Sequence, residues 1–336
     1  MKAIVYHQYG GPDVLQCEQI EKPAPGDDQV LIRVRAASIN PLDTGLMKGE
    51  PYLLRLFFGW PRPRITRPGR DVAGVVEALG KQVTRFKAGD EVFGLCTGGS
   101  WRAKADGSFA EFACTLESAL AAKPPNISFD EAAAAPVAGL SALQGLRDKC
   151  RVQPGHKVLI NGAGGGVGTF AVQIAKALGA EVTAVSNGRN LVAVRALGAD
   201  SFIDYTSEDF CRRPEKYDAV FDCYSSHSPL AIRRVLNPKG VYLVVGGPTG
   251  NWAVSLARLL VTFFIILVLS PFTSRKLATF LARSDQKDLD LLREMMADGR
   301  VRPVVDRSYA LSEVANAMRH LEQDHPLGKV VISLGS

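Results

Sequence analysis

Glycines in the middle of the chain stand in a pattern that binds phosphate. Residues 157–179 read KVLINGAGGGVGTFAVQIAKALG, where a β-branched apolar run precedes the glycines and apolar residues recur at helical spacing after them. The pattern predicts a buried strand, a tight turn and a helix whose free N–H groups and dipole stabilise an anion. It matches a dinucleotide fingerprint in which Ala163 replaces the first glycine. We therefore expect a dinucleotide, rather than a tight turn without a ligand, on Ala163, Gly164, Gly165, Gly166, Val167 and Gly168.

The residues after the next predicted strand, 181–186, bear on which dinucleotide binds. NAD-binding folds place an acidic residue about twenty positions beyond the glycines, where it accepts a hydrogen bond from the ribose 2′-hydroxyl. There is no acidic residue between Val182 and Ala199. Ser186, Asn187 and Arg189 are found there instead, and their donors suit a 2′-phosphate. The sequence therefore predicts NADPH, with a solvated Arg189 at the start of a helix as the alternative.

The residue pattern differs between three segments of the chain, and each pattern predicts elements that position this turn. Residues 1–124 hold short strands separated by glycine and proline, which is typical of a small β-barrel. Residues 125–283 alternate strands and helices, the pattern of a doubly wound parallel sheet. Residues 284–336 hold two amphipathic helices and a last strand, and we expect them to pack back on the first domain. The predicted fold class is α/β, with a barrel domain at 1–124 completed by 284–336 and a dinucleotide-binding domain at 125–283.

Composition narrows the class of protein. The chain has 336 residues, of which 46% are hydrophobic and 22% charged, as is typical of a globular protein. A net charge of +6 slightly favours an anionic partner, but no nucleic-acid-binding motif is present, so we expect no nucleic acid. The six cysteines form no Cys-x-x-Cys pair, which favours free thiols in a reducing, cytoplasmic location.

Motifs spread over almost the whole length resemble the zinc-independent branch of the medium-chain dehydrogenase/reductase superfamily, the quinone oxidoreductase-like proteins. The resemblance rests on 38–43 (SINPLD), 68–76 (PGRDVAGVV), 107–112 (GSFAEF), 161–168 (NGAGGGVG), 197–200 (LGAD) with 204–205 (DY), and 328–332 (GKVVI). It implies a GroES-like barrel for the first domain and a Rossmann fold for the second. We also expect a homodimer.

The resemblance also implies where a catalytic zinc would stand. Zinc-dependent members use Cys near the position of Asn40, a Gly-His-Glu where this chain has Gly69-Arg70-Asp71, and a third ligand near Val137. None of these positions holds Cys or His here. A catalytic zinc needs about three protein ligands, so we expect no metal.

Further site residues are predicted at the edge where a nicotinamide would react. Gly246 and Gly247 close a predicted strand at the edge where open α/β sheets bind ligands, so backbone could approach the ring there. The resemblance implies that Asn40 and Asp43 face the cofactor and that Ser141 lies beside it. Turn capping is the alternative for Asn40 and Asp43, and a purely structural role is open for Asp43.

Three other residues complete the predicted site. The resemblance implies that Lys176 and Tyr205 neighbour the adenosine phosphate. We expect Tyr52 in the substrate cleft, where it is either a proton donor or an aromatic wall.

Two apolar stretches fit none of these roles. Trp252–Leu269 reads WAVSLARLLVTFFIILVL, and its uncharged part, Leu259–Leu269, has eleven residues, whereas a membrane span needs about 20 apolar residues. A buried helix, a subunit interface, a pocket lining and a shallow membrane contact remain open for it. Residues 53–60 are also mostly apolar and precede four arginines, at 62, 64, 67 and 70. That combination suits contact with an anionic bilayer, with a cleft lid carrying a solvated basic loop as the alternative.

These observations favour a zinc-independent, NADPH-dependent oxidoreductase. It would transfer hydride to a quinone or to the activated C=C bond of a lipophilic enone, enal or enoyl substrate, with the cofactor supplying the chemistry. Reduction of an enoyl thioester is a variant of this hypothesis. Since no general acid is evident, the alternative is a non-catalytic or weakly catalytic protein at a membrane periphery that keeps the fold for interaction.

Overall fold

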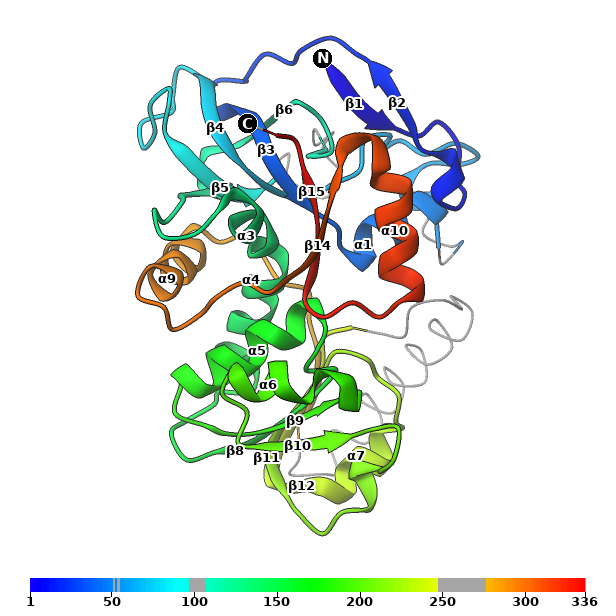
Figure 1. Cartoon of the computed structure of the whole chain (residues 1–336), viewed down its shortest axis with the longest axis vertical. Coiled ribbons are helices and arrows are strands. Elements are labelled where there is room, and N and C mark those ends of the chain that lie inside the picture. The colour runs from blue at the N-terminus through cyan, green and yellow to red at the C-terminus, as the bar shows by residue number, and fades with distance from the viewer. Residues whose placement is uncertain (51, 53–54, 97–106, 247–275, 336) are drawn as a thin grey trace. The chain divides into compact units, whose positions relative to one another are not determined.

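The computed structural model describes the chain except for residues 51, 53–54, 97–106, 247–275 and 336. The predictions for Gly247 and for Trp252–Leu269 therefore lie outside the described residues. The chain divides into two compact units (Figure 1). The first comprises Met1–Val137, Ser284–Gly299 and Pro303–Ser336, and the second comprises Ala138–Arg283 and Arg300–Arg302.

The first unit is built on a seven-stranded sheet with the order β14-β15-β3-β4-β5-β7, in which β6 pairs with β3. All pairs are antiparallel except β14 with β15. A separate antiparallel pair, β1 with β2, completes the β structure described here. The strands are β1 (Lys2–Val5), β2 (Gln16–Gln19), β3 (Gln29–Ser38), β4 (Asp71–Leu79), β5 (Glu91–Leu95), β6 (Phe112–Leu116), β7 (Leu120–Ala122), β14 (Val305–Ala310) and β15 (Lys329–Ser333).

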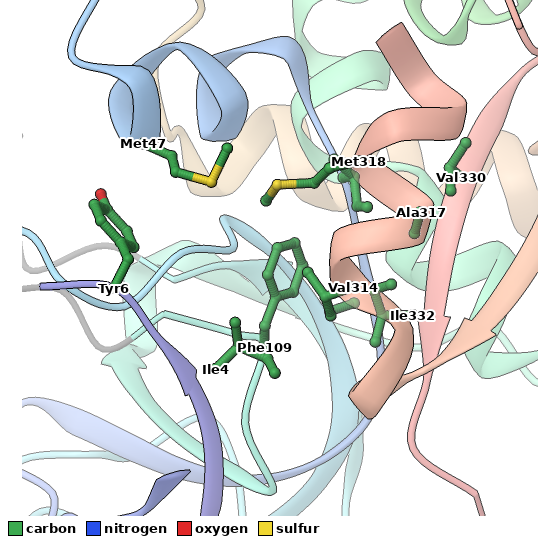
Figure 2. Close-up of a cluster of buried hydrophobic side chains, with 11 residues drawn as sticks. Ile4, Tyr6, Met47, Phe109, Val314, Ala317, Met318, Val330 and Ile332 are labelled. Carbon is green, nitrogen blue, oxygen red and sulfur yellow. The ribbon is translucent and has the colours of Figure 1, made fainter. Parts of the chain in front are cut away.

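The C-terminal segment packs back on the first unit, as the sequence predicted. β15 pairs with β3, and its apolar side chains enter a core shared with the N-terminal strands. Figure 2 shows Met47 and Met318 directed toward each other in this core, beside Phe109. The helices of the first unit are α1 (Pro41–Lys48), α2 (Arg55–Phe58), α3 (Phe129–Ala134), α9 (Gln286–Ala297) and α10 (Val314–Gln323).

The boundary between the units falls after Val137, whereas the sequence placed it after residue 124. The reason is α3. Its helical sequence pattern is like that of the second unit, but its buried alanines pack against β3 and β4 of the first unit. Ser128 begins this helix as expected, with its hydroxyl accepting from Glu131 N and its own N–H donating to the Glu131 carboxylate.

The second unit is a six-stranded parallel sheet with the order β10-β9-β8-β11-β12-β13. Counted from β8, this is the 3-2-1-4-5-6 order of a dinucleotide-binding fold, whose direction reverses between β8 and β11. The strands are β8 (Lys157–Asn161), β9 (Glu181–Ser186), β10 (Ser201–Asp204), β11 (Tyr217–Asp222), β12 (Leu236–Val244) and β13 (Lys276–Thr279). The helices are α4 (Pro136–Gln144), whose first two residues belong to the first unit, α5 (Gly166–Ala177), α6 (Leu191–Ala196) and α7 (Pro229–Val235).

Among the elements of the first unit that were not predicted, α1 and β14 each have a clear physical reason. The Asn-Pro pair at 40–41 indicates a turn, yet Pro41 is the first residue of α1, because proline suits the first helical position. Val305–Ala310 is mostly polar and exposed, yet it forms β14, because it is an edge strand that pairs only with β15. Among the described residues, no helix combines the length and apolar character required to cross a membrane.

Candidate functional site

The predicted glycine turn joins β8 to α5. Gly162 has a positive φ of 83°, and its carbonyl accepts from Gly165 N at 3.0 Å, which closes the turn. A Cβ at Gly168 would lie 2.1 Å from the Gly162 carbonyl oxygen, so only glycine allows α5 to start this close to the strand. Gly165 is the N-cap of α5. The amino end of a 12-residue helix therefore begins at the glycines.

The turn packs against the carboxyl end of β9. A Cβ at Gly164 would lie 2.5 Å from Asn190 Nδ2 and 2.7 Å from Ser186 Oγ. Those two side chains are themselves hydrogen-bonded at 3.0 Å. The structure therefore brings the glycine turn and the last residue of β9 to one place, as the dinucleotide interpretation requires.

Three more predicted residues stand at this edge. The Asn187 side chain accepts from Arg189 N at 3.0 Å, and Arg189 is exposed. Tyr205, which follows β10, donates its backbone N–H to the Ser186 carbonyl at 3.2 Å, and its side chain is half exposed. An acidic neighbour was missed, because Asp204 lies one strand away, beside Gly188. Its Oδ1 accepts from the backbone and hydroxyl of Thr206, which lowers the pKa of the Asp204 carboxyl.

The expectation for Lys176 is wrong. Its ammonium pairs with both oxygens of Asp200, at 2.8 and 2.9 Å, and donates to the Ala180 carbonyl. Asp200 in turn accepts from Val182 N near the amino end of β9, which is the end opposite Ser186. Lys176 therefore lies near the amino end of β9, whereas an adenosine phosphate is expected at the carboxyl end.

A buried carboxylate that the sequence analysis did not single out organises the neighbouring strand end. Asp222 closes β11 beside the point where the strand order reverses. Its oxygens accept from Asn161 Nδ2 at 2.8 Å and from the Tyr242 hydroxyl at 2.9 Å. It also accepts from the backbone N–H groups of residues 224 and 225.

The loop after β11 in turn places Gly246. The Ser225 hydroxyl donates to the Gly246 carbonyl at 3.0 Å, and a Cβ at Gly246 would lie 2.5 Å from the carbonyl oxygen of Cys223. Glycine is thus required at 246 by the neighbouring backbone of Cys223, and the approach of this backbone to a nicotinamide stays a prediction. Ser141 lies in α4 and is 8% exposed.

In the first unit, a buried polar cluster forms around Asp71. Asp71 Oδ2 accepts from Ser38 Oγ at 2.5 Å and from Asn40 Nδ2 at 2.9 Å. Asp71 Oδ1 accepts from the backbone N–H of Val137 at 2.8 Å. The Lys329 ammonium lies 3.3 Å from Asp71 Oδ2 and donates to Asn40 Oδ1 at 2.6 Å. With Asp71 fully buried and Lys329 only 4% exposed, the two charges compensate each other away from water.

Asn40 and Asp43 stand at the start of α1. Asp43 accepts from the backbone N–H of Asn40 at 2.8 Å and from that of Gly69 at 3.2 Å. Asp43 therefore caps the turn, as the structural alternative proposed. The Asn40 side chain instead joins Asp71 and Lys329. Burial raises the pKa of the Asp43 carboxyl from 3.8 to about 6, against the opposing effect of the Asn40 N–H.

Tyr52 lies on the surface of the first unit. Its ring stacks on the Arg55 guanidinium, 4.5 Å from the centroid, and its side chain is 48% exposed. The structure thus brings Asn40 and Asp43 into one buried cluster. Tyr52 is not part of it and lies on the surface beside Arg55.

The resemblance implies that zinc-dependent relatives bind their metal near the positions of Asn40, Gly69-Arg70-Asp71 and Val137, and one residue from each of these places lies here. Asn40, Asp71 and Val137 are joined by hydrogen bonds in one cluster. These residues do not fit a zinc ion, because they include no Cys or His and both carboxylates, of Asp71 and Asp43, already accept hydrogen bonds, and because the Lys329 ammonium supplies the positive charge. The sequence analysis missed Lys329; a lone lysine in the apolar strand 329–333 was the available signal.

Comparisons with known proteins agree with this architecture. A family model described as an alcohol dehydrogenase GroES-like domain matches residues 26–125, and one described as a zinc-binding dehydrogenase matches residues 197–332. The chain is 36% identical to the NADPH-dependent alkenal/one oxidoreductase of Arabidopsis thaliana, over 99% of this chain and 79% of that protein. It is 32% identical to the chloroplast envelope quinone oxidoreductase homolog of the same plant, over 99% and 98% of the two chains.

Solved structures point the same way. The quinone oxidoreductase from Coxiella burnetii superimposes with a TM-score of 0.84, at 29% identity and with 99% of both chains covered. The chain therefore belongs to the medium-chain dehydrogenase/reductase superfamily, in its quinone oxidoreductase-like branch.

Proposed function

We propose that this protein is a zinc-independent, NADPH-dependent oxidoreductase that reduces a quinone or the activated C=C bond of an enone or enal. One observation carries the proposal. The cluster of the first unit in which related enzymes hold zinc contains a buried lysine ammonium, while the second unit presents a complete dinucleotide turn. The enzyme must therefore act on substrates that accept hydride without a metal to polarise them.

The second unit has the residues to hold the cofactor. The glycine turn and the amino end of α5 would bind the pyrophosphate. Ser186, Asn187, Arg189 and Tyr205 lie at the carboxyl ends of β9 and β10, where a 2′-phosphate would find one guanidinium and several hydrogen-bond donors. The Arabidopsis alkenal/one oxidoreductase is NADPH-dependent by name, which supports the same choice here.

NADPH, when bound, supplies a hydride to the β-carbon of an enone or to a quinone, and a proton completes the reduction. Asn40 is the polar side chain proposed to face the reacting groups, since Asp71 and Lys329 fix its amide from both sides. Asp43 positions Asn40 through the backbone N–H. Water is proposed as the proton source, because Tyr52 is engaged with Arg55.

The test is NADPH oxidation by the purified chain over a panel of benzoquinones, naphthoquinones, enones, enals and enoyl thioesters, with and without a strong zinc chelator. Turnover of quinones or enones that the chelator leaves unchanged supports the proposal. Turnover lost on chelation and restored by zinc would overturn the metal-free assignment. NADPH binding with no turnover on any substrate would indicate a protein that keeps the fold without the activity.

We also propose a lipophilic substrate, a homodimer and a cytoplasmic location. The six cysteines are all free in the structure, which supports a reducing compartment. Burial raises the pKa of the Cys96 and Cys150 thiols to about 12, so neither is ionised at neutral pH. Light scattering during gel filtration measures the oligomeric state, and a monomer at micromolar concentration would refute the dimer.

A further inference from the structure

Exposed apolar side chains concentrate on one short segment of the first unit. Ten large apolar side chains are exposed among the described residues, and four of them stand between residues 52 and 60. They are Tyr52, Leu56, Phe57 and Trp60, with exposed fractions of 48%, 64%, 48% and 68%. We call these four side chains the apolar patch. Exposed apolar side chains that gather in one place mark an interaction site, whereas singly scattered ones need no explanation.

The patch is held outward by contacts of α2 with α1. Arg55, the basic residue of α2, is turned inward, where it donates to the backbone carbonyls of Lys48 and Gly49 at 2.9 and 3.1 Å. Its guanidinium also lies 4.4 Å from the ring centroid of Tyr9. This arrangement is the reverse of an ordinary surface helix, because the charged side chain binds the protein while Leu56 and Phe57 face solvent.

The turn after α2 is equally well fixed. Gly59 donates to the Arg55 carbonyl at 2.8 Å, and its own carbonyl accepts from the Tyr9 hydroxyl at 2.8 Å. Its φ is +124°, and a Cβ there would lie 2.2 Å from the Arg62 carbonyl oxygen, so glycine permits the turn. The Arg64 N–H closes it on the Phe58 carbonyl at 2.7 Å. Trp60 is therefore presented by an ordered turn.

Charge next to the patch selects its partner. Arg62 and Arg64 are exposed, and no carboxylate forms an ion pair with either of them in the part of the chain that the structure describes. Between residues 50 and 70 the sequence has five arginines and one acidic residue, Glu50. Apolar side chains beside unpaired arginines match a bilayer that offers acyl chains and anionic head groups together.

We infer that the apolar patch with Arg62 and Arg64 docks the protein on the surface of an anionic membrane. Leu56, Phe57 and Trp60 enter the head-group boundary, and the two arginines bind lipid phosphates. Such binding is peripheral and reversible, since only a few side chains of the apolar patch insert. The inference does not rest on the proposed activity, because membrane binding can be measured without turnover.

The test is co-sedimentation of the full chain with phosphatidylcholine vesicles that contain or lack phosphatidylglycerol. We expect binding only to the anionic vesicles, and weaker binding at high salt. Arg62→Gln with Arg64→Gln should lower the partition coefficient about 30-fold, since each arginine contributes roughly fivefold. Leu56→Ser with Phe57→Ser should abolish binding. The matched control is Leu230→Ser with Arg233→Gln on α7, an exposed apolar residue and an exposed arginine, which should bind like the parent.

A second measurement places the patch itself in the membrane. Brominated lipids should quench Trp60 fluorescence, and the quenched component should be missing in Trp60→Phe. The inference is overturned if the parent chain does not bind anionic vesicles. It is also overturned if the control variant loses binding while the patch variants keep it. If the patch variants instead raise KM for a short-chain quinone in vesicle-free buffer, while no chain binds vesicles, the patch belongs to a substrate site and the inference fails.

Discussion

The Lys329 ammonium donates a 2.6 Å hydrogen bond to Asn40 Oδ1, which joins two residues 289 positions apart in the chain. The same ammonium lies 3.3 Å from Asp71 Oδ2. One lysine on the C-terminal strand thus fixes the amide of a proposed site residue and neutralises a buried carboxylate. The C-terminal strand therefore completes the charge balance of the cluster, in addition to pairing with β3 and filling the apolar core.

Replacing Lys329 should therefore destabilise the first unit strongly. Lys329→Met leaves the buried Asp71 carboxylate without a counter-ion, and loss of one partner of a buried pair costs about 3–5 kcal/mol. Thermal unfolding followed by calorimetry should show an earlier transition for the first unit. The double variant Lys329→Met with Asp71→Asn removes the unpaired charge as well, so it should recover part of the lost stability.

The control for this prediction is Lys22→Met. Lys22 pairs with Glu77 on the surface, where its side chain is 42% exposed, and such a pair contributes about 0–1 kcal/mol. If Lys329→Met is no less stable than Lys22→Met, the Lys329–Asp71 pair does not hold the cluster together.

Gly164→Ala should weaken cofactor binding more than it weakens the fold. The added methyl would meet Asn190 Nδ2 and Ser186 Oγ, which are ends of side chains that can shift, so the second unit should still fold. Their displacement changes the site at the end of β9, and we expect the Kd for NADPH to rise about tenfold or more, a loss of at least about 1.4 kcal/mol.

Titration calorimetry measures that change, and Gly11→Ala is its matched control. Gly11 has open space where a Cβ would stand and lies in the first unit, so this variant should bind NADPH like the parent. Equal affinity for Gly164→Ala and the parent would mean that NADPH does not approach Gly164.

Features that are encoded in a short run of consecutive residues could be predicted from the sequence. The strand, glycine turn and helix around Gly165 are encoded within 23 consecutive residues, 157–179, and the structure has all three elements. β9 was predicted with its observed bounds, because β-branched residues mark a buried parallel strand.

The rest depended on contacts between distant segments. Asp71 and Lys329 are 258 positions apart, and the residues around each of them give no indication that the two form an ion pair. Lys176 was placed at the phosphate by resemblance alone, whereas its partner Asp200 is visible only once β9 and the segment before β10 lie side by side. β14 was missed because an exposed edge strand lacks the apolar alternation by which strands are recognised.

The choice of cofactor should depend on Arg189. Arg189→Gln removes a charged donor from the 2′-phosphate, and a hydrogen bond to a charged group contributes about 1.5–3 kcal/mol. The Kd for NADPH should rise about 10–100-fold, while the Kd for NADH, which has no such phosphate, should change little.

Arg195→Gln is the matched control for cofactor choice, because Arg195 is an exposed arginine of α6 in the same unit. Fluorescence titration of both variants with NADPH and NADH separates the two effects. Equal losses of NADPH affinity in the two variants, or an Arg189→Gln chain that still prefers NADPH as strongly as the parent, would remove Arg189 from the phosphate site.

Asp43 should make stability depend on pH. Its folded pKa of about 6 exceeds the ordinary 3.8, so the native state keeps a proton that the unfolded chain has already lost between these values. Stability rises with pH only where the unfolded state binds more protons, so here the free energy of unfolding should fall as pH rises from about 4 to above 6. The difference between a pKa of 3.8 and one of about 6 corresponds to a contribution of about 3 kcal/mol to the free energy of unfolding.

Asp43→Asn tests this sign. Asparagine does not titrate and can accept from only one of the two N–H groups, of Asn40 and Gly69, that the carboxylate binds. The variant should thus be less stable than the parent near pH 4, where the parent carboxyl is protonated, and the difference should shrink as pH rises past 6 and ionisation destabilises the parent. Denaturant unfolding across this range measures the difference, with Asp28→Asn as an exposed control whose profile should follow the parent. An Asp43→Asn profile parallel to that of the parent at every pH would show that burial does not hold the proton on Asp43, and the carboxylate would then cap α1 in its charged form throughout.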